Sequence, residues 1–117
     1  MAERFRVSGR VIETETGRPL PDLIVRAFDR DLVFDDKLGS ASTDADGLFE
    51  IRFTERDFRD LRESRPDLYL RVYDRSGQRL LLDTSTRVRV NAQRSETFDI
   101  EIPGAALQPR RGPNAAC

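Results

Sequence analysis

The stretch T-D-A-D-G-L-F-E-I at residues 43 to 51 contains the residue types of a calcium-binding loop. Calcium binds roughly six to eight oxygen atoms, which carboxylates and carbonyls supply. Aligning Gly47 with the glycine of an EF-hand loop places Ser42, Asp44 and Asp46 at the first three ligand positions, but the closing acid falls on Phe53. Calcium would therefore need a composite site that also draws on the neighbouring loop, with candidate ligands Asp29, Asp31, Asp35, Asp36, Asp44 and Asp46.

The same stretch can also be read as a hairpin connection. Asp44 and Asp46 would accept hydrogen bonds from nearby backbone N–H groups, and Gly47 would supply the positive φ that a tight turn requires. Phe49 would then begin the inward face of the next strand. We favour the turn, so we predict neither a metal site nor a cofactor, and the calcium alternative consists of Asp29, Asp31, Asp44 and Asp46.

Catalytic chemistry has little support in the residue types. The chain has no histidine, which excludes a histidine general base, a catalytic triad and a histidine zinc site, and its one cysteine is the last residue, Cys117. The paired acids Asp35 and Asp36, and Glu13 and Glu15, come with neither a nucleophile nor an orienting base, so we interpret them as solvated charges. We predict that the chain is not an enzyme.

Two tyrosines form the clearest candidate binding surface. Tyr69, Arg71 and Tyr73 alternate with Leu68, Leu70 and Val72, so the two tyrosines share one strand face with Arg71 between them. If exposed, this face could stack against a sugar or bind a protein; if covered, it is part of the core edge. We favour the covered alternative, because the chain has no tryptophan and only 8% aromatic residues.

The amino-acid composition limits which classes of partner the chain could bind. The chain has 117 residues, and its 20 basic and 21 acidic residues give a net charge of −1, so no overall field attracts nucleic acid or anionic lipid. Lys37 is the only lysine; the other basic residues are arginines, which suit planar pairing with carboxylates. No stretch approaches the roughly 20 apolar residues of a membrane span, and no export signal is visible, so we expect a cytoplasmic protein or export by another route.

Period-two alternation predicts a series of short strands separated by turn residues. A capping-box pattern, T-E-R-D at 54 to 57, predicts one short helix near 55 to 63. We expect an all-β, seven- to eight-stranded antiparallel sandwich over residues 1 to 103, with a disordered tail over 104 to 117. The predicted strands are 5–11, 23–29, 38–43, 49–53, 68–73, 78–83, 87–90 and 96–102.

The turn motifs carry a family likeness. T-G-R-P-L-P at 16 to 21, A-F-D-R-D at 27 to 31, T-D-A-D-G-L-F at 43 to 49 and V-Y-D at 72 to 74 resemble the carboxypeptidase-regulatory-like domains, which belong to the transthyretin-like (prealbumin-like) sandwiches. With the capped helix, the chain is similar to versions found in bacterial insecticidal toxin-complex subunits. The likeness covers roughly residues 4 to 102. The enzymes with related sandwiches use histidines, and pilin-type isopeptide bonds need a strand lysine, whereas Lys37 is expected in a loop.

The resemblance implies a non-catalytic structural or protein-interaction module, an accessory domain of a toxin, secretion or cell-surface assembly. The alternative is a carbohydrate-binding module that uses Tyr69 and Tyr73, and a calcium-stabilised binding domain is a further alternative. We therefore expect a protein partner, no nucleic acid and no membrane insertion. Polysaccharide retention that depends on Tyr69 or Tyr73 would distinguish the carbohydrate alternative.

Overall fold

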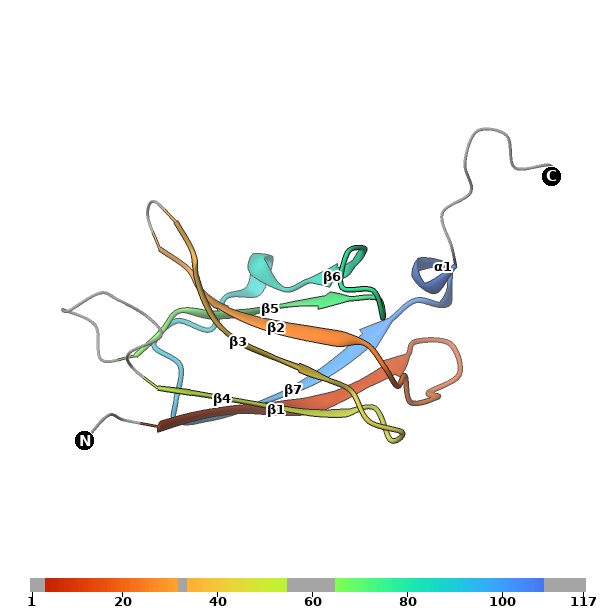
Figure 1. The fold of residues 1–117 in the computed structure, drawn as a ribbon, viewed down its shortest axis with the longest axis horizontal. Helices are drawn as coiled ribbons and strands as arrows, with labels where there is room; N and C mark the ends of the chain where they lie inside the picture. The colour runs from red at the N-terminus through yellow and green to blue at the C-terminus, as the bar shows by residue number, and fades with distance from the viewer. Residues whose placement is uncertain (1–3, 32–33, 55–64, 109–117) are drawn as a thin grey trace.

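The computed structural model describes residues 4–31, 34–54 and 65–108. Within these residues seven strands form two sheets (Figure 1). The strands are β1 (Arg4–Glu13), β2 (Ile24–Asp29), β3 (Asp36–Ser42), β4 (Leu48–Thr54), β5 (Leu68–Tyr73), β6 (Leu80–Asp83) and β7 (Ser95–Ile102). The expected all-β sandwich is confirmed.

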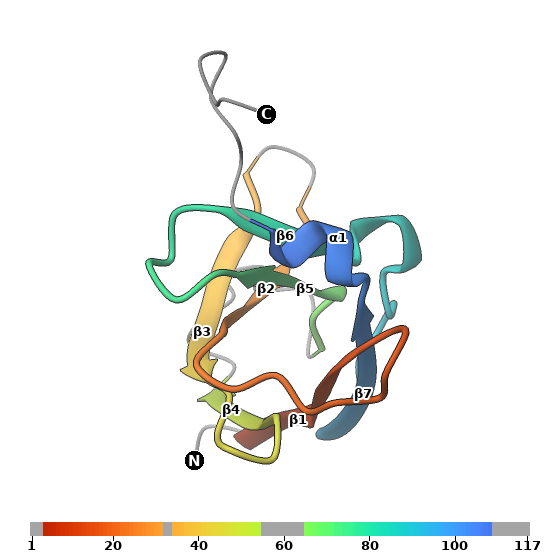
Figure 2. The same cartoon turned by 90° about the vertical axis from the view of Figure 1, so that its right-hand side faces the viewer.

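The sheets have three and four strands. The three-stranded sheet has the order β4-β1-β7, and the four-stranded sheet has the order β3-β2-β5-β6. Seen end-on, the two sheets face each other, and they come together at β3 and β4 (Figure 2). The prediction of a purely antiparallel sandwich was wrong in one place, because β1 pairs in parallel with β7. The long connection between these two strands makes that pairing possible, since a parallel pair cannot be joined by a tight turn.

The core lies between the sheets and follows the alternation of the strands. The apolar side chains of the inward rows of β1 and β4 are buried, among them Phe5, Val7, Phe49 and Ile51. Gly9 continues the inward row of β1 without a side chain: an added Cβ would lie 2.1 Å from the Phe98 carbonyl oxygen and 2.9 Å from Cζ of Phe49. The Phe49 ring thus occupies the space beside Gly9, and a glycine is required there by packing.

Two local predictions differ from the structure. Lys37 lies in strand β3 and not in a loop, because the β2–β3 pairing extends to Asp29 and Asp36 past a register shift at Ala27/Phe28. The strand predicted at 87–90 is instead a 3-10 helix at Ser85–Arg87 followed by one isolated bridge between Leu68 and Arg89. The pairing does not continue into β5, because the next carbonyl on that side of the strand, that of Leu70, accepts instead from the Thr84 N–H at 2.9 Å.

The end of the described chain also differs from the expected disorder. Residues Gly104–Leu107 form a short helix, α1, and Ala106 and Leu107 pack against the core. The Gly104 N–H donates to Oε1 of Glu15 at 2.7 Å, which ties α1 to the loop after β1. The helix predicted at 55–63 and Cys117 both lie outside the described residues. No helix in the described part of the chain is long and apolar enough to cross a membrane.

Candidate functional site

The turn between β3 and β4 holds its shape with its own side chains. Oδ1 of Asp44 accepts hydrogen bonds from the backbone N–H groups of Asp46 and Leu48, at 2.9 and 3.0 Å. Gly47 has a φ of +75°, and an added Cβ would lie 2.4 Å from the Val11 carbonyl oxygen. The hairpin interpretation of residues 43 to 48 therefore describes this segment, with Asp44 as the residue that caps the turn.

The composite calcium site does not form. Ile24 pairs with Ser42 and Asp29 pairs with Asp36, so Asp29 lies at the far end of the β2–β3 hairpin from Asp44. Five residue steps along β2 separate these ends by about 16 Å. Asp29 is also buried, and its Oδ1 accepts from the Asp67 N–H at 2.8 Å. Among the described residues no group of three or more acidic or cysteine side chains is placed to hold a metal ion.

Three acids of the other predicted pairs, Glu13, Glu15 and Asp35, accept hydrogen bonds from nearby residues. Oε1 of Glu13 accepts from the Thr16 hydroxyl at 2.6 Å, and Glu15 accepts from the N–H of Gly104. Asp35 accepts from the N–H of Asp31 at 3.1 Å. These contacts assign the carboxylates to loop structure.

The predicted binding residues Tyr69, Arg71 and Tyr73 lie on the outer face of the four-stranded sheet. Their register neighbours on β2 are Phe28, Arg26 and Ile24, which point the same way. The Phe28 and Tyr69 rings stack with centroids 5.3 Å apart and planes 17° apart. Two strands thus contribute one continuous surface of rings and guanidinium groups.

The arginines of this surface lie against the rings. Cζ of Arg71 is 5.1 Å from the ring centroid of Phe28 and 5.7 Å from that of Tyr69, and Cζ of Arg26 is 4.3 Å from the Tyr73 centroid. Such contacts are worth about 0.5–1 kcal/mol each at exposed sites. We call Arg26, Phe28, Tyr69, Arg71 and Tyr73 the arginine-aromatic face.

Tyr69 is the covered part of this face. Its side chain is 1% exposed, so it offers no ring for stacking, while Tyr73 is half-buried. The Tyr69 hydroxyl donates to Oδ2 of Asp35. Burial, together with this hydrogen bond, raises the pKa of Tyr69 to about 12, and the same hydrogen bond lowers the pKa of Asp35. The tyrosine therefore fastens the loop before β3 to the sheet.

Arg71 is fixed by a carboxylate as well as by rings. Its Nε donates to Oδ2 of Asp83 on β6 at 2.9 Å. Burial opposes the charge of Arg71, but hydrogen bonds to Asp83 and Tyr73 outweigh burial and raise the pKa of the guanidinium. The group is consequently held in one place on the sheet.

Sequence reasoning missed Arg26 and Phe28 as members of this face. The signal was available in the alternation of Ile24, Arg26 and Phe28 with Val25 and Ala27. What the sequence could not supply was the register that places Arg26 opposite Arg71 and Phe28 opposite Tyr69.

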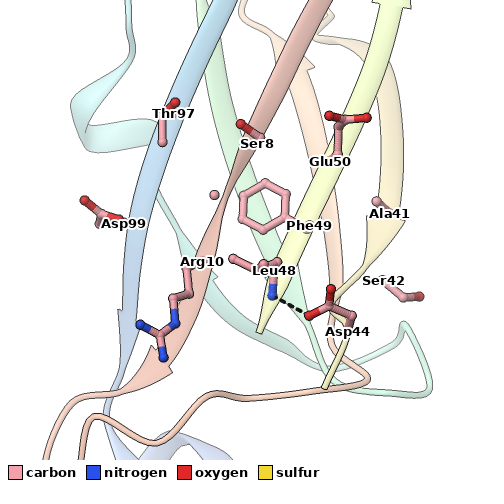
Figure 3. Close-up of a pocket in the computed structure, with 11 residues that line it drawn as sticks. Ser8, Arg10, Ala41, Ser42, Asp44, Leu48, Phe49, Glu50, Thr97 and Asp99 are labelled. Atoms are coloured by element: carbon pink, nitrogen blue, oxygen red, sulfur yellow. Dashed lines mark hydrogen bonds between the residues drawn. The ribbon is translucent and has the colours of Figure 1, made fainter. Parts of the chain in front are cut away.

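A second feature is a hollow of about 620 Å³ on the outer face of the three-stranded sheet. Figure 3 shows Ser8 and Arg10 on β1, flanked by β4 and β7. Nε of Arg10 donates to the Asp46 carbonyl at 3.3 Å, which closes one end of the hollow with the 43–48 turn. Glu50, at the other end, pairs with arginines. The hollow offers hydroxyl and charged groups for hydrogen bonding, and the sequence supplies no histidine to activate a hydroxyl.

Comparisons with known proteins give the fold and little more. No protein-family model matches the sequence, and no curated protein matches it. The structure of a 9R-lipoxygenase from Cyanothece PCC8801 is similar over 86% of this chain, with a TM-score of 0.63 and 26% identity. This chain spans only 17% of that lipoxygenase chain.

A second similar structure is the dioxygenase domain of a dioxygenase carbohydrate-binding protein fusion from the cellulolytic bacterium Streptomyces sp. SirexAA-E. The match covers 88% of the present chain and 81% of the dioxygenase domain, with a TM-score of 0.52 and 18% identity. At that identity the likeness concerns the fold alone.

Proposed function

We propose that the chain is a non-catalytic accessory domain that binds a protein partner through the arginine-aromatic face. The resemblance to carboxypeptidase-regulatory-like domains supports this proposal and implies a toxin, secretion or cell-surface assembly as the setting. The match to a small fraction of a lipoxygenase chain is consistent with a domain that serves as part of a larger protein.

The observation that supports the proposal most strongly is that the guanidinium group of Arg71 is preorganised. Ring contacts and Asp83 fix its guanidinium before any partner arrives, so little side-chain entropy remains to be lost on binding. Arginine and tyrosine are enriched among the residues that dominate binding energy in protein interfaces. Arg26 and Tyr73, both half-buried, extend the same surface.

The carbohydrate alternative receives no support from this face. A sugar platform built on both tyrosines needs both rings exposed, and Tyr69 is buried under Phe28 and Arg71. The similar dioxygenase domain does not favour it either, since the match concerns the dioxygenase part of that fusion.

The proposal is tested by affinity capture from a lysate of the cells that produce the protein. The bait is compared with a variant carrying Arg26→Gln and Tyr73→Ser, and with Arg87→Gln as a matched control at an exposed arginine away from the face. We expect a protein captured by the original bait and the control but lost from the double variant, with melting curves showing that all three baits are folded at the temperature of capture. The proposal would be contradicted if the double variant captured the protein as well as the original bait did. Recovery of polysaccharide alone, or turnover of a small molecule, would also contradict it.

A further inference from the structure

A group of arginines lies at the three-stranded sheet, on the opposite side of the sandwich from the arginine-aromatic face. A hollow of about 520 Å³ is lined by Arg4, Phe5 and Arg6 of β1, by Arg52, Phe53 and Thr54 of β4, and by Arg94. We call these four arginines the arginine hollow. The chain as a whole has a net charge of −1, so the described lining of this hollow is more positive than the chain average.

Backbone pairing brings the four residues together. Arg6 pairs directly with Arg52 across β1 and β4, and Arg4 lies two residues further along the same face of β1. The Arg6 N–H donates to the Arg94 carbonyl at 2.7 Å, which places Arg94 beside β1. Like charges directly opposite each other on adjacent strands destabilise a sheet unless an acidic group compensates them, and between Arg6 and Arg52 a single carboxylate, Glu50, does so. One carboxylate is thus shared by two guanidinium groups, which leaves a local excess of positive charge among the described residues.

The contacts of Glu50 show that the arginines of the hollow can bind a carboxylate. Its two carboxylate oxygens contact Arg6 and Arg52: Nη1 of Arg6 lies 3.3 Å from Oε1, and Nε of Arg52 lies 2.9 Å from Oε2. One carboxylate is therefore already held between the two opposed guanidinium groups. A guanidinium has five N–H donors, so Arg6 and Arg52 retain donors for further carboxylates. Their side chains are 50% and 75% exposed, so those donors are accessible from solvent.

The surroundings indicate a short acidic ligand. On the same outer face, toward the other end of the sheet, the exposed residues Asp99 and Glu101 follow along β7. An extended polyanion such as nucleic acid would meet these carboxylates, whereas a short peptide with a few acidic side chains would not. Carboxylates also match the planar, bidentate geometry of arginine.

We propose that the arginine hollow binds an acidic segment of a partner protein, through carboxylates held by Arg4, Arg6 and Arg52. This inference goes beyond the proposed function and stands on a different sheet from the arginine-aromatic face, so either can fail while the other holds.

The test measures fluorescence anisotropy of a labelled eight-residue oligo-glutamate peptide, with an oligo-glutamine peptide of the same length as the control ligand. We expect the acidic peptide alone to bind and its affinity to fall as salt rises. Arg4→Gln and Arg52→Gln should each weaken binding about three- to five-fold, and together about tenfold or more. The changed side chains are exposed, and a melting curve of each variant checks that it is folded.

Two further variants sharpen the result. Glu50→Gln removes the internal carboxylate that occupies Arg6 and Arg52, so it should tighten peptide binding about three-fold. Arg87→Gln, on the 3-10 helix, should leave the affinity unchanged, as should the paired Arg26 and Tyr73 replacements of the other face.

Several outcomes would overturn the inference. They are equal affinity for the two peptides, weaker binding by Glu50→Gln, and loss of affinity no greater in the arginine variants than in Arg87→Gln. Arginine-dependent binding of inorganic triphosphate or single-stranded DNA more tightly than the peptide would assign the hollow to phosphates instead. Self-association that disappears in Arg52→Gln would assign it to a second copy of this chain.

Discussion

Replacement of Thr43 by valine tests how the turn before β4 is attached to the rest of the sandwich. The Thr43 side chain is 3% exposed. Its hydroxyl donates to the Leu20 carbonyl at 2.6 Å and accepts from the Leu23 N–H at 3.0 Å. Valine has nearly the same shape but can make neither hydrogen bond, so it would leave two buried backbone groups without partners.

The expected loss follows from these two groups. Each buried unsatisfied group destabilises by about 1–3 kcal/mol, or about 2–6 kcal/mol for both. Burying a methyl group in place of the hydroxyl offsets about 1 kcal/mol. We therefore expect Thr43→Val to lower the free energy of unfolding by about 3 kcal/mol, which corresponds to a decrease in Tm of about 10–15 °C for a domain of this size.

Thr43→Ser is the matched control. Serine keeps the hydroxyl and loses one buried methyl group, so its expected loss is about 1 kcal/mol. Urea unfolding followed by far-UV circular dichroism measures both variants, and equal m-values are needed for the comparison. If the valine protein proved as stable as the serine protein, the hydroxyl of Thr43 would not be holding the two backbone groups, and the reasoning would be refuted.

Three more predictions concern packing, pH and metal. Gly9→Ala should lower the free energy of unfolding by about 2–4 kcal/mol, because its Cβ meets the Phe98 carbonyl at 2.1 Å; urea unfolding with a loss under about 0.5 kcal/mol would contradict this. The raised pKa of Tyr69, about 12 against about 10 in an unfolded chain, contributes stability that is full below pH 10 and is lost by pH 12. Unfolding free energies of the original protein should therefore fall with pH across that window by about 1.4 kcal/mol per unit more steeply than those of Tyr69→Phe, and parallel curves would disprove the shift. Millimolar calcium or chelator should leave Tm unchanged to within about 1 °C, since the residues that the structure describes contain no group of acidic side chains placed to hold a metal ion; a larger rise with calcium would restore the metal hypothesis.

Much of the secondary structure could be predicted because alternation along a strand is a local property. The inward rows of β1, β4 and β5 follow from apolar residues at every second position, and the turn at Gly47 follows from its composition. The start of strand β3 was harder to predict. The register between β2 and β3 shifts between Ala27 and Phe28, and an irregularity of this kind disrupts the period on which the prediction depends. Lys37 was therefore expected in a loop.

The candidate site was predictable only within single strands. Alternation places Tyr69, Arg71 and Tyr73 on one face, and the structure agrees. Whether that face is open depended on Phe28 and Asp35, which reach Tyr69 from other segments and cover it. The arginine hollow was beyond prediction, because its members come from three segments of the chain.

The sequence by itself determined the class of fold, the position of the 43–48 turn and the absence of histidine chemistry, since residue types and short spacings are sufficient for each. Tertiary structure decided that Asp29 and Asp44 lie at opposite ends of one hairpin, and that Arg6 faces Arg52. Both placements are set by strand register, and register depends on pairing between residues far apart in the chain. The T-D-A-D-G stretch is therefore a turn, and the surfaces that can bind a partner lie on the outer faces of the two sheets.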